Sequence, residues 1–425
     1  MPSEIDLLRS LDDEPPAPST VNIDRAIQSG RRRNRRRGWG YAGVAALTVV
    51  AVAGVAVVNA RTTKTPSNLA ATKKPTATAS AKPKAAYTIP GTAGWVAPVA
   101  AAPTSCTIAK LPVPSKEPMA LVSGGDPTGA YHVGRTYPKG GGYQAVIWHG
   151  GTVTKVMLPG DLEESLRDVN SAGTAVGWSY TGGSEEETGS VPYAYVNGKV
   201  VKLPGVQRGG AEAINEAGAI VGDDESAPAT DASSHAIFWP SATSKPVRLP
   251  VPAGVQASAA VDIDEDGTTV GNLDLKTPYV WFADGTHHDL ALPTNKGKTA
   301  VAARVFSIRN GIAVGVADET DRNGGGAGKM WAVQWNVRTG ETKVLGGFDM
   351  SPDAINAQGW MVGIDTKGYA ILDTGGRTLQ LPMLAKHDPG SLTNIPNAIS
   401  DDGRTIVGQS DNANDVIQPV VWHCQ

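Results

Sequence analysis

The sequence has only two cysteines and no net basic charge, and these two absences exclude two classes of function. The only cysteines are Cys106 and Cys424, and no set of Cys and His residues has the spacing of a structural zinc site. The formal net charge is −3, so no overall basic field points to nucleic acid. We therefore expect neither a zinc knuckle nor a nucleic-acid partner.

Catalytic motifs and helical periodicity are missing as well. The sequence has no Gly-x-Ser-x-Gly elbow, no His-Glu-x-x-His pair and no phosphate-binding loop. Apolar residues do not recur with the period of about 3.6 that a helical repeat needs. Charged residues make up 19% of the chain, whereas Gly (50) and Pro (30) are abundant. This composition is typical of short strands joined by many turns, and no cofactor is expected.

One ten-residue pattern recurs along the chain. Its clearest copy is Ala213–Gly222 (AINEAGAIVG), and a looser copy is Gly125–Gly134. The closing glycine recurs every 43 to 49 residues, a period typical of a solenoid, a propeller or an array. The other copies are Asp168–Gly177, Asp262–Gly271, Ser307–Gly315, Ala354–Gly363 and Ala398–Gly408.

Each repeat predicts four β-strands, named a, b, c and d in chain order. The Asn-x-x-Gly part of the pattern is a tight turn between strands a and b. A third run ends in an aromatic residue, as in Ala236–Trp239, and a fourth ends in Leu-Pro, as in Leu249–Pro250 and Leu292–Pro293. Four strands in about 45 residues make the blade of a β-propeller. Seven copies predict an all-β, seven-bladed propeller over residues 105–425.

The last blade lacks its fourth strand, because only three residues follow Trp422. The missing strand is expected at the other end of the domain, where Ser105–Pro112 carries the same Leu-Pro ending. Pairing of the two segments would close the ring and cover an exposed sheet edge. It would also make Cys106 and Cys424 neighbours, so we expect a disulfide between them in an oxidising compartment. The alternative is two unrelated free thiols.

The repeats resemble the extracellular HAF-repeat family of bacterial β-propeller-like proteins. His235–Trp239 approximates the strand that gives the family its name, and Ala213–Asn215 with Gly218 and Val221–Gly222 matches its turn-and-strand half. The resemblance covers roughly residues 105–425; most copies lack the His, and Leu-Pro stands where the family has Leu-Gly. It implies a surface or secreted location and a propeller-like fold, and it implies no reaction.

Three segments are expected ahead of the propeller. Residues 1–37 form a polar tail that ends in six arginines, and its two short helical patterns would need a partner or a membrane surface to persist. Residues 38–60 carry no charge and are long enough for one transmembrane helix, with a cleaved signal peptide as the alternative. The arginines place the N-terminus in the cytoplasm and the propeller outside the cell membrane. Residues 61–104, rich in Ala, Thr, Pro and Lys, are expected to be a disordered spacer.

Ligand contact is expected at the rim made by the b–c and d–a connections. These connections are long and variable, whereas the a–b turns are short, and long loops on a rigid scaffold are the usual binding positions. Their acidic residues could hold a cation or a basic ligand, and a solvated surface is the alternative. The candidate rim residues are Glu185, Glu186, Glu187, Asp223, Asp224, Glu225, Asp318, Glu319 and Asp321.

Two further polar clusters are predicted to be structural. Asp262–Gly267 begins like a calcium loop, but its twelfth position is Leu273 rather than the bidentate Glu that calcium needs, so a turn is predicted. His287 and His288 are adjacent on a strand and point to opposite faces, so they do not predict a shared metal.

The sequence favours a non-catalytic binding or interaction module held outside the membrane. Its ligand would be a peptide, a glycan or another surface protein, and residues 1–37 could couple binding to a cytoplasmic partner. One alternative is a carbohydrate-active hydrolase or lyase that uses rim carboxylates. The other is a purely structural surface protein, since a propeller fold specifies no function by itself.

Overall fold

The computed structural model describes residues 87–425 apart from short gaps at 115–116, 139–141, 161–162, 181–188, 227–233, 321–328 and 389–391. The expected tail (1–37), the expected transmembrane helix (38–60) and residues 61–86 lie outside these ranges. Within them every regular element is a β-strand. No helix in the described ranges is therefore long and apolar enough to cross a bilayer.

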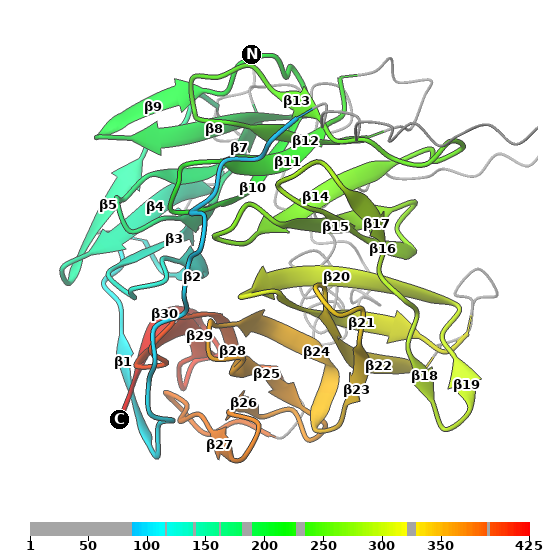
Figure 1. Cartoon of the computed structure of the whole chain (residues 1–425). Coiled ribbons are helices and arrows are strands. Elements are labelled where there is room, and N and C mark those ends of the chain that lie inside the picture. The colour runs from blue at the N-terminus through cyan, green and yellow to red at the C-terminus, as the bar shows by residue number, and fades with distance from the viewer. Residues whose placement is uncertain are drawn as a thin grey trace, which may run out of the picture. The chain divides into compact units, whose positions relative to one another are not determined.

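Seven four-stranded antiparallel sheets form the blades of a β-propeller (Figure 1), which confirms the predicted fold class. Blade 1 contains β2 (Ala120–Gly125), β3 (Tyr131–Thr136), β4 (Gln144–His149) and β5 (Thr152–Val156). Blade 2 contains β6 (Glu164–Val169), β7 (Ala175–Tyr180), β8 (Ser190–Val196) and β9 (Lys199–Lys202). Blade 3 contains β10 (Gly209–Ile214), β11 (Ile220–Asp224), β12 (His235–Trp239) and β13 (Val247–Arg248).

The next three blades repeat the same order of strands. Blade 4 contains β14 (Ser258–Ile263), β15 (Thr269–Leu273), β16 (Thr277–Trp281) and β17 (His287–Asp289). Blade 5 contains β20 (Ala302–Arg309), β21 (Ile312–Asp318), β22 (Met330–Asn336) and β23 (Thr342–Leu345). Blade 6 contains β24 (Phe348–Ile355), β25 (Met361–Asp365), β26 (Ala370–Asp373) and β27 (Thr378–Gln380).

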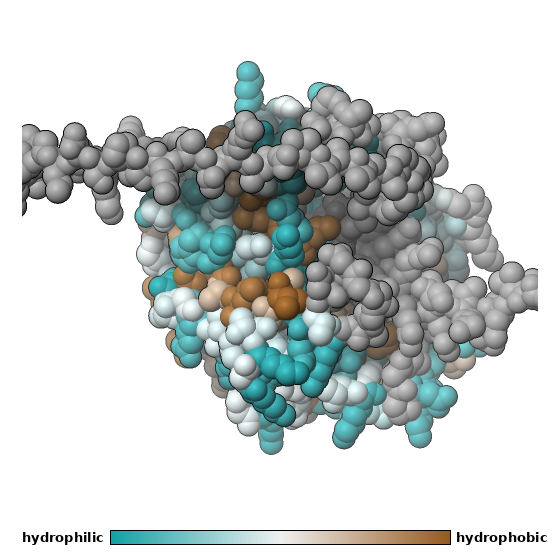
Figure 2. All heavy atoms as spheres, turned by 90° about the vertical axis from the view of Figure 1, so that its right-hand side faces the viewer, coloured by the Kyte–Doolittle hydropathy of each residue, from teal (hydrophilic) through white to brown (hydrophobic). Residues whose placement is uncertain are grey.

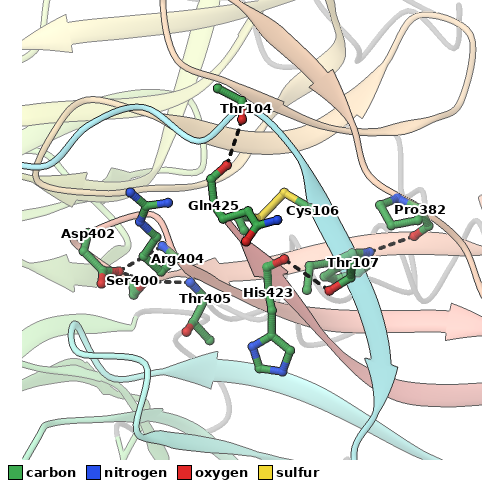
Figure 3. The surroundings of a disulfide bond; sticks show 12 residues. Thr104, Cys106, Thr107, Pro382, Ser400, Asp402, Arg404, Thr405, His423 and Gln425 are labelled. Carbon is green, nitrogen blue, oxygen red and sulfur yellow. Dashed lines mark hydrogen bonds between the residues drawn. A yellow bond between two sulfur atoms is a disulfide. The ribbon is translucent and has the colours of Figure 1, made fainter.

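Blade 7 combines both ends of the described chain. Its strands a to c are β28 (Asn394–Ile399), β29 (Thr405–Asp411) and β30 (Ile417–Cys424), and its outer strand is β1 (Cys106–Lys110). Cys106 lies opposite Cys424 in the β1–β30 register, and the two form the expected disulfide. Nearby, the Thr107 hydroxyl donates to the His423 carbonyl and the Thr104 hydroxyl to the Gln425 carbonyl (Figure 3). The a strands contact one another around the whole ring, and β28 contacts β2.

The c-strand tryptophans join blades 1, 3, 4, 5 and 7 to the blade before each. Trp148, Trp239, Trp281, Trp335 and Trp422 are all at most 1% exposed. The indole Nε1 of Trp239 donates to the Pro204 carbonyl at 2.9 Å, and that of Trp422 to the Pro382 carbonyl at 2.7 Å. The same bond recurs from the other three tryptophans to the carbonyls of Pro112, Pro250 and Ala291. The Trp and the Leu-Pro of the repeat are therefore two halves of one contact between blades.

The end of blade 4 differs from the sequence prediction. Leu292–Pro293 was expected to end strand d, but Leu290 is the buried leucine at 4% exposure and Leu292 is 37% exposed. The Trp335 indole accordingly donates to the Ala291 carbonyl, which follows Leu290. The two residues after Ala291 lead into an extra hairpin of β18 (Thr294–Asn295) and β19 (Lys298–Thr299). On the side of the molecule that carries this hairpin, apolar side chains gather in a band between polar ones (Figure 2).

A bulge in every a strand explains why the repeated pattern ends in glycine. Each a–b pair shifts register at the same place, as between Ala211 and Ala213 in blade 3. The bulge brings an a-strand carbonyl close to the Gly opposite it, so that a Cβ on Gly222 would lie 2.0 Å from the Gly210 carbonyl oxygen. Only a residue without a Cβ fits this close approach.

We expect Gly222→Ala to lower the free energy of unfolding by at least about 2 kcal/mol, since the added methyl group meets backbone that cannot move aside. Gly376→Ala is the matched control, because a Cβ there has no atom within 4 Å. Thermal and urea unfolding of both variants checks the prediction. Equal melting temperatures for the two variants would contradict it.

Residues 87–104 pack on the propeller, although they were placed in the spacer by their composition. Ile89 is 1% exposed in a cluster with Phe238 of blade 3 and Trp281 of blade 4. In Figure 1 this segment is the blue ribbon that runs from the side of β13 across the ring towards blade 7. The packed part of the chain therefore includes residues 87–104, because a few anchoring side chains order a segment whose composition alone does not.

Candidate functional site

The two ends of the ring are built differently. In an antiparallel four-stranded blade the a–b and c–d turns lie at one end, which we call the turn face. The b–c and d–a connections lie at the other end, which we call the loop face. Glycines at positive φ occupy the a–b turns, such as Gly173 and Gly218. The turn face carries the repeated pattern, and the loop face carries the candidate rim residues.

In blades 2 to 6, the Asn or Asp of the a–b turn links that turn to the next blade. The Asn170 Nδ2 donates to the Asn215 carbonyl at 3.2 Å, and the Asn356 Nδ2 donates to the Ser400 carbonyl at 2.9 Å. The Asp264 carboxylate accepts from the backbone nitrogens of Asn310 and Gly311. These side chains also close their own turns, as Asn215 Oδ1 does by accepting from Ala219 N. The polar residues of the repeat therefore hold the ring together.

Arg309 extends this network across the turn face. Its guanidinium donates to Asp401 of blade 7 at 2.6 Å and to Glu265 of blade 4 at 2.5 Å. The ring of Trp95, from the N-terminal segment, lies 5.0 Å from the guanidinium carbon. The two carboxylates raise the pKa of Arg309 against the effect of burial, so the cation is permanent. On the turn face, Arg309 therefore joins blades 4, 5 and 7 and the N-terminal segment.

The calcium-like segment of blade 4 is part of this network and forms no cation site. Asp262 accepts from Ser307 Oγ and Ile308 N of blade 5, both at 2.8 Å. Asp266 pairs with Arg338 at 3.1 Å. Nowhere in the described ranges do three or more potential ligand side chains gather in a geometry that could hold a metal. His287 and His288 also have separate partners, the Tyr279 hydroxyl and the Asp289 carbonyl.

On the loop face, the structure describes part of the predicted set of acidic residues. Asp223 and Asp224 end β11, Glu225 follows them, and Asp318 ends β21 two blades away. Asp318 faces Arg304 at 3.7 Å, and Glu319 binds Lys298 at 2.8 Å. Glu185, Glu186, Glu187 and Asp321 lie outside the described residues. The blade 3 and blade 5 acids therefore belong to separate clusters.

The blade 3 cluster brings the carboxylates of buried Asp223 and part-buried Glu212 together at Gly210. A Cβ at Gly210 would lie 2.9 Å from Glu212 Oε1 and 3.4 Å from Asp223 Oδ1. Asp223 is 4% exposed and accepts from the Gly210 nitrogen at 2.9 Å. Glu212 is the bulged residue of β10, and its other oxygen binds Arg167 Nε at 3.1 Å. We call Glu212, Asp223, Glu225 and their arginine partners Arg167 and Arg208 the blade 3 site.

Sequence reasoning missed Glu212, Arg167 and Arg208. Arg208 pairs with Glu225 at 3.4 Å, beside the connection into blade 3. Arg167 and Glu212 are the bulged residues of neighbouring a strands. A pattern that alternates strictly along a strand assigns such residues to the wrong face. Each of these two bulged residues is a charged residue three positions before the turn Asn, and this shared position is the signal that could have revealed them.

Both carboxyl groups of the blade 3 pair hold protons more tightly than ordinary carboxyl groups do. Burial raises the pKa of Glu212, and Arg167 partly offsets the effect. Burial raises the pKa of Asp223 well above its usual range, and the charges of Glu225 and Glu212 raise it further. A cationic group placed between the two carboxylates would restore their ionised forms. The pair is therefore suited to holding a cation, and also to giving or taking a proton.

Comparison with known proteins gives low structural similarity and no family. No family model matches the chain, and no curated protein matches it. An oligogalacturonate lyase in complex with manganese aligns at a TM-score of 0.46 and 12% identity, over 75% of this chain and 93% of the lyase. The β-propeller domain of the Trilobed protease from Pyrococcus furiosus aligns at a TM-score of 0.47 and 10% identity, over 72% of this chain and 95% of that domain. Similarities this low carry no inference about activity, substrate or metal.

Two carboxyl groups at the blade seams have raised pKa values, from which the change of stability with pH can be predicted. Burial raises the pKa of Asp168 to about 8 and the pKa of Asp262 to about 6. The folded state binds these protons more tightly than the unfolded chain, so this stabilisation is complete below about pH 4 and is lost as the pH rises to 8. Burial lowers the pKa of His132 to about 4, which opposes the trend only below about pH 6.5.

We therefore expect the melting temperature to fall as the pH rises from about 6.5 to about 8.5. Asp168→Asn should flatten this slope, because the amide oxygen can still accept from Ile214 N but carries no charge at any pH. Glu341→Gln, at an exposed carboxylate, serves as the control and should keep the wild-type slope. Calorimetry across this pH range checks the prediction, and a wild-type slope in Asp168→Asn would refute it.

Proposed function

We propose that this protein is an extracytoplasmic, membrane-anchored β-propeller that binds a ligand carrying a cationic group, without catalysis, at the blade 3 site. The main evidence for this proposal is the pair of Glu212 and Asp223 beside Gly210. Burial raises the pKa of both carboxyl groups. A protonated amine inserted between them would gain two charge-assisted hydrogen bonds. The ligand class is a basic peptide segment, an amino-bearing glycan or the basic patch of another surface protein.

The difference between the two faces supports this location. The turn-face groups described above bind one another or the N-terminal segment. On the loop face, Gly210 at the start of β10 carries no side chain, which lets the carboxylates of Glu212 and Asp223 lie beside its backbone. A rigid ring that positions polar groups on one rim is a usual arrangement for recognition.

The proposed compartment and anchor rest on three features. The Cys106–Cys424 disulfide is of a kind that persists in oxidising compartments. Residues 38–60 are uncharged and follow six arginines, which fits one membrane span with a cytoplasmic N-terminus. A role for residues 1–37 in recruiting a cytoplasmic partner belongs to the same proposal.

Binding to a cationic probe tests the site. We expect the full chain to bind a tri-lysine peptide with a salt-sensitive affinity that Glu212→Gln and Asp223→Asn each weaken by about tenfold, one buried charge-assisted contact being worth 1.4 kcal/mol or more. Glu341→Gln on the turn face should leave the affinity unchanged. Equal binding by all three variants would show that the attraction is not local to this site.

A glycan hydrolase or lyase is the second candidate, and the same carboxylate pair favours it. Acid–base chemistry on a glycosidic bond needs two carboxyl groups at a defined separation, one of which keeps its proton near neutral pH. Turnover of a polysaccharide that is lost in both Glu212→Gln and Asp223→Asn, with binding retained, would replace the non-catalytic proposal by this one.

We also propose that β1 and its disulfide hold the ring closed. Five residue pairs join β1 to β30, and the disulfide links positions 318 residues apart. Cys106→Ser with Cys424→Ser should lower the free energy of unfolding by about 2 to 5 kcal/mol, the range for removing a disulfide that closes a long loop. Non-reducing peptide mapping together with unfolding curves checks this. Separate cysteine peptides, or unchanged stability, would contradict it.

A further inference from the structure

Residues 87–104, which we call the strap, lie on the turn face as an extended peptide would lie on a receptor. The strap contains no strand, so it pairs with no blade. Its backbone is bound by groups of the ring instead. Asn215 Nδ2 donates to the Pro90 carbonyl at 2.9 Å, and Thr92 N donates to the Glu265 carbonyl at 2.7 Å. Further along, Gln358 Nε2 donates to the Pro98 carbonyl.

Two side chains anchor the strap. Ile89 is 1% exposed and fills an apolar site between blades 3 and 4, with Tyr87 beside it at 5.9 Å from the Phe238 ring. Trp95, six positions after Ile89, stacks on the Arg309 guanidinium. Between these anchors the chain passes so close to the ring that a Cβ on Gly91 would lie 2.3 Å from the Asp266 carbonyl carbon. The turn face therefore fits a peptide in which an aliphatic residue is followed by Pro-Gly and then by an aromatic residue.

The ring side of this contact is organised without the strap. Arg309 is fixed by Glu265 and Asp401, and Asn215 closes its own turn through Ala219. These partners belong to blades 3, 4 and 7, so they remain in place when the strap leaves. A preformed surface keeps its affinity for any chain that presents the same groups.

The strap is weakly held beyond its anchors. Val96 is 82% exposed and Val99 is 98% exposed, and the two flank the Pro98 contact. Ala101 and Ala102 are exposed as well, just before the chain turns into β1. Between Val96 and Ala102 few side chains therefore hold the strap, and its attachment depends on the anchors and on the backbone contacts at Pro90, Thr92 and Pro98.

We propose that the turn face is a peptide-binding site, occupied in cis by the strap and open to an extended segment of the same chemistry from another chain. The ligand class is a peptide with an aliphatic residue followed by Pro-Gly and an aromatic residue six positions after the aliphatic one. This site lies at the opposite end of the ring from the blade 3 site and shares no residue with it. Failure of either proposal leaves the other intact.

A cut in the strap tests the proposal without altering the ring. A specific protease sequence is inserted between Ala101 and Ala102 of the full chain, and the purified protein is cleaved. The N-terminal fragment is then held only by the contacts described above. A fluorescent peptide with the sequence of residues 87–98 is added in excess.

The cleaved chain should bind the labelled peptide saturably, one per ring, and release its own N-terminal fragment. The uncleaved chain should bind at least about tenfold less, because its tethered strap competes at high effective concentration. Peptides with Ile89→Asp or Trp95→Ala should bind at least about tenfold more weakly, as anchor residues do. A Val96→Ser peptide is the matched control and should bind as the wild-type peptide does.

Three results would overturn the proposal. The first is a cleaved chain that releases its fragment and takes up no labelled peptide. The second is equal binding of the wild-type, Ile89→Asp and Trp95→Ala peptides. The third is a ring that unfolds when the fragment leaves, seen as loss of the near-ultraviolet circular dichroism of its buried tryptophans, since the strap would then be part of the fold.

Discussion

The seams between blades are the constraint on which this structure depends. Each sheet satisfies its own backbone hydrogen bonds, but carbonyls at turns and strand ends are buried where one blade meets the next. Two kinds of donor reach across: the turn Asn, as from Asn170 to Asn215, and the c-strand indole, as from Trp239 to Pro204. A buried carbonyl without such a donor would cost about 1 to 3 kcal/mol. The repeated sequence records this requirement at the seams where an Asn stands in the turn or a Trp in strand c.

Because the repeated residues bridge the seams between blades, they can be distinguished from residues that are candidates for ligand binding. Asp262 and Asp264 have the chemistry of cation ligands, yet their oxygens bind backbone and hydroxyl groups of blade 5. Glu212 and Asp223 instead lie together on one strand pair outside the repeated pattern. Burial raises the pKa of both carboxyl groups, and Glu212 also pairs with Arg167 of blade 2. Residues that vary between blades, rather than those that recur, are the ones to examine for a ligand.

The sequence predicted the blades, the disulfide and the structural role of the tryptophans, because each depends on spacing along the chain. It did not predict Glu212 or Arg167, since a bulge breaks the alternation by which strand faces are assigned. It assigned Leu292 instead of Leu290 because the buried Leu290 is followed by Ala291, whereas the Leu-Pro pair stands two residues later, just before the inserted hairpin. It also treated residues 87–104 as spacer, since composition does not reveal that Ile89 and Trp95 meet matching sites on the ring.

The bond between Cys106 and Cys424 gives the domain a further property. It encloses nearly the whole propeller in one covalent circle, because the two residues lie 318 positions apart. A protease that cuts a single loop within that circle linearises it and releases no fragment. Exposed loop tips are the usual positions of such cuts. A domain of this kind can be nicked once and still keep every blade attached to its neighbours, so it tolerates proteolytic damage that would divide an open chain in two.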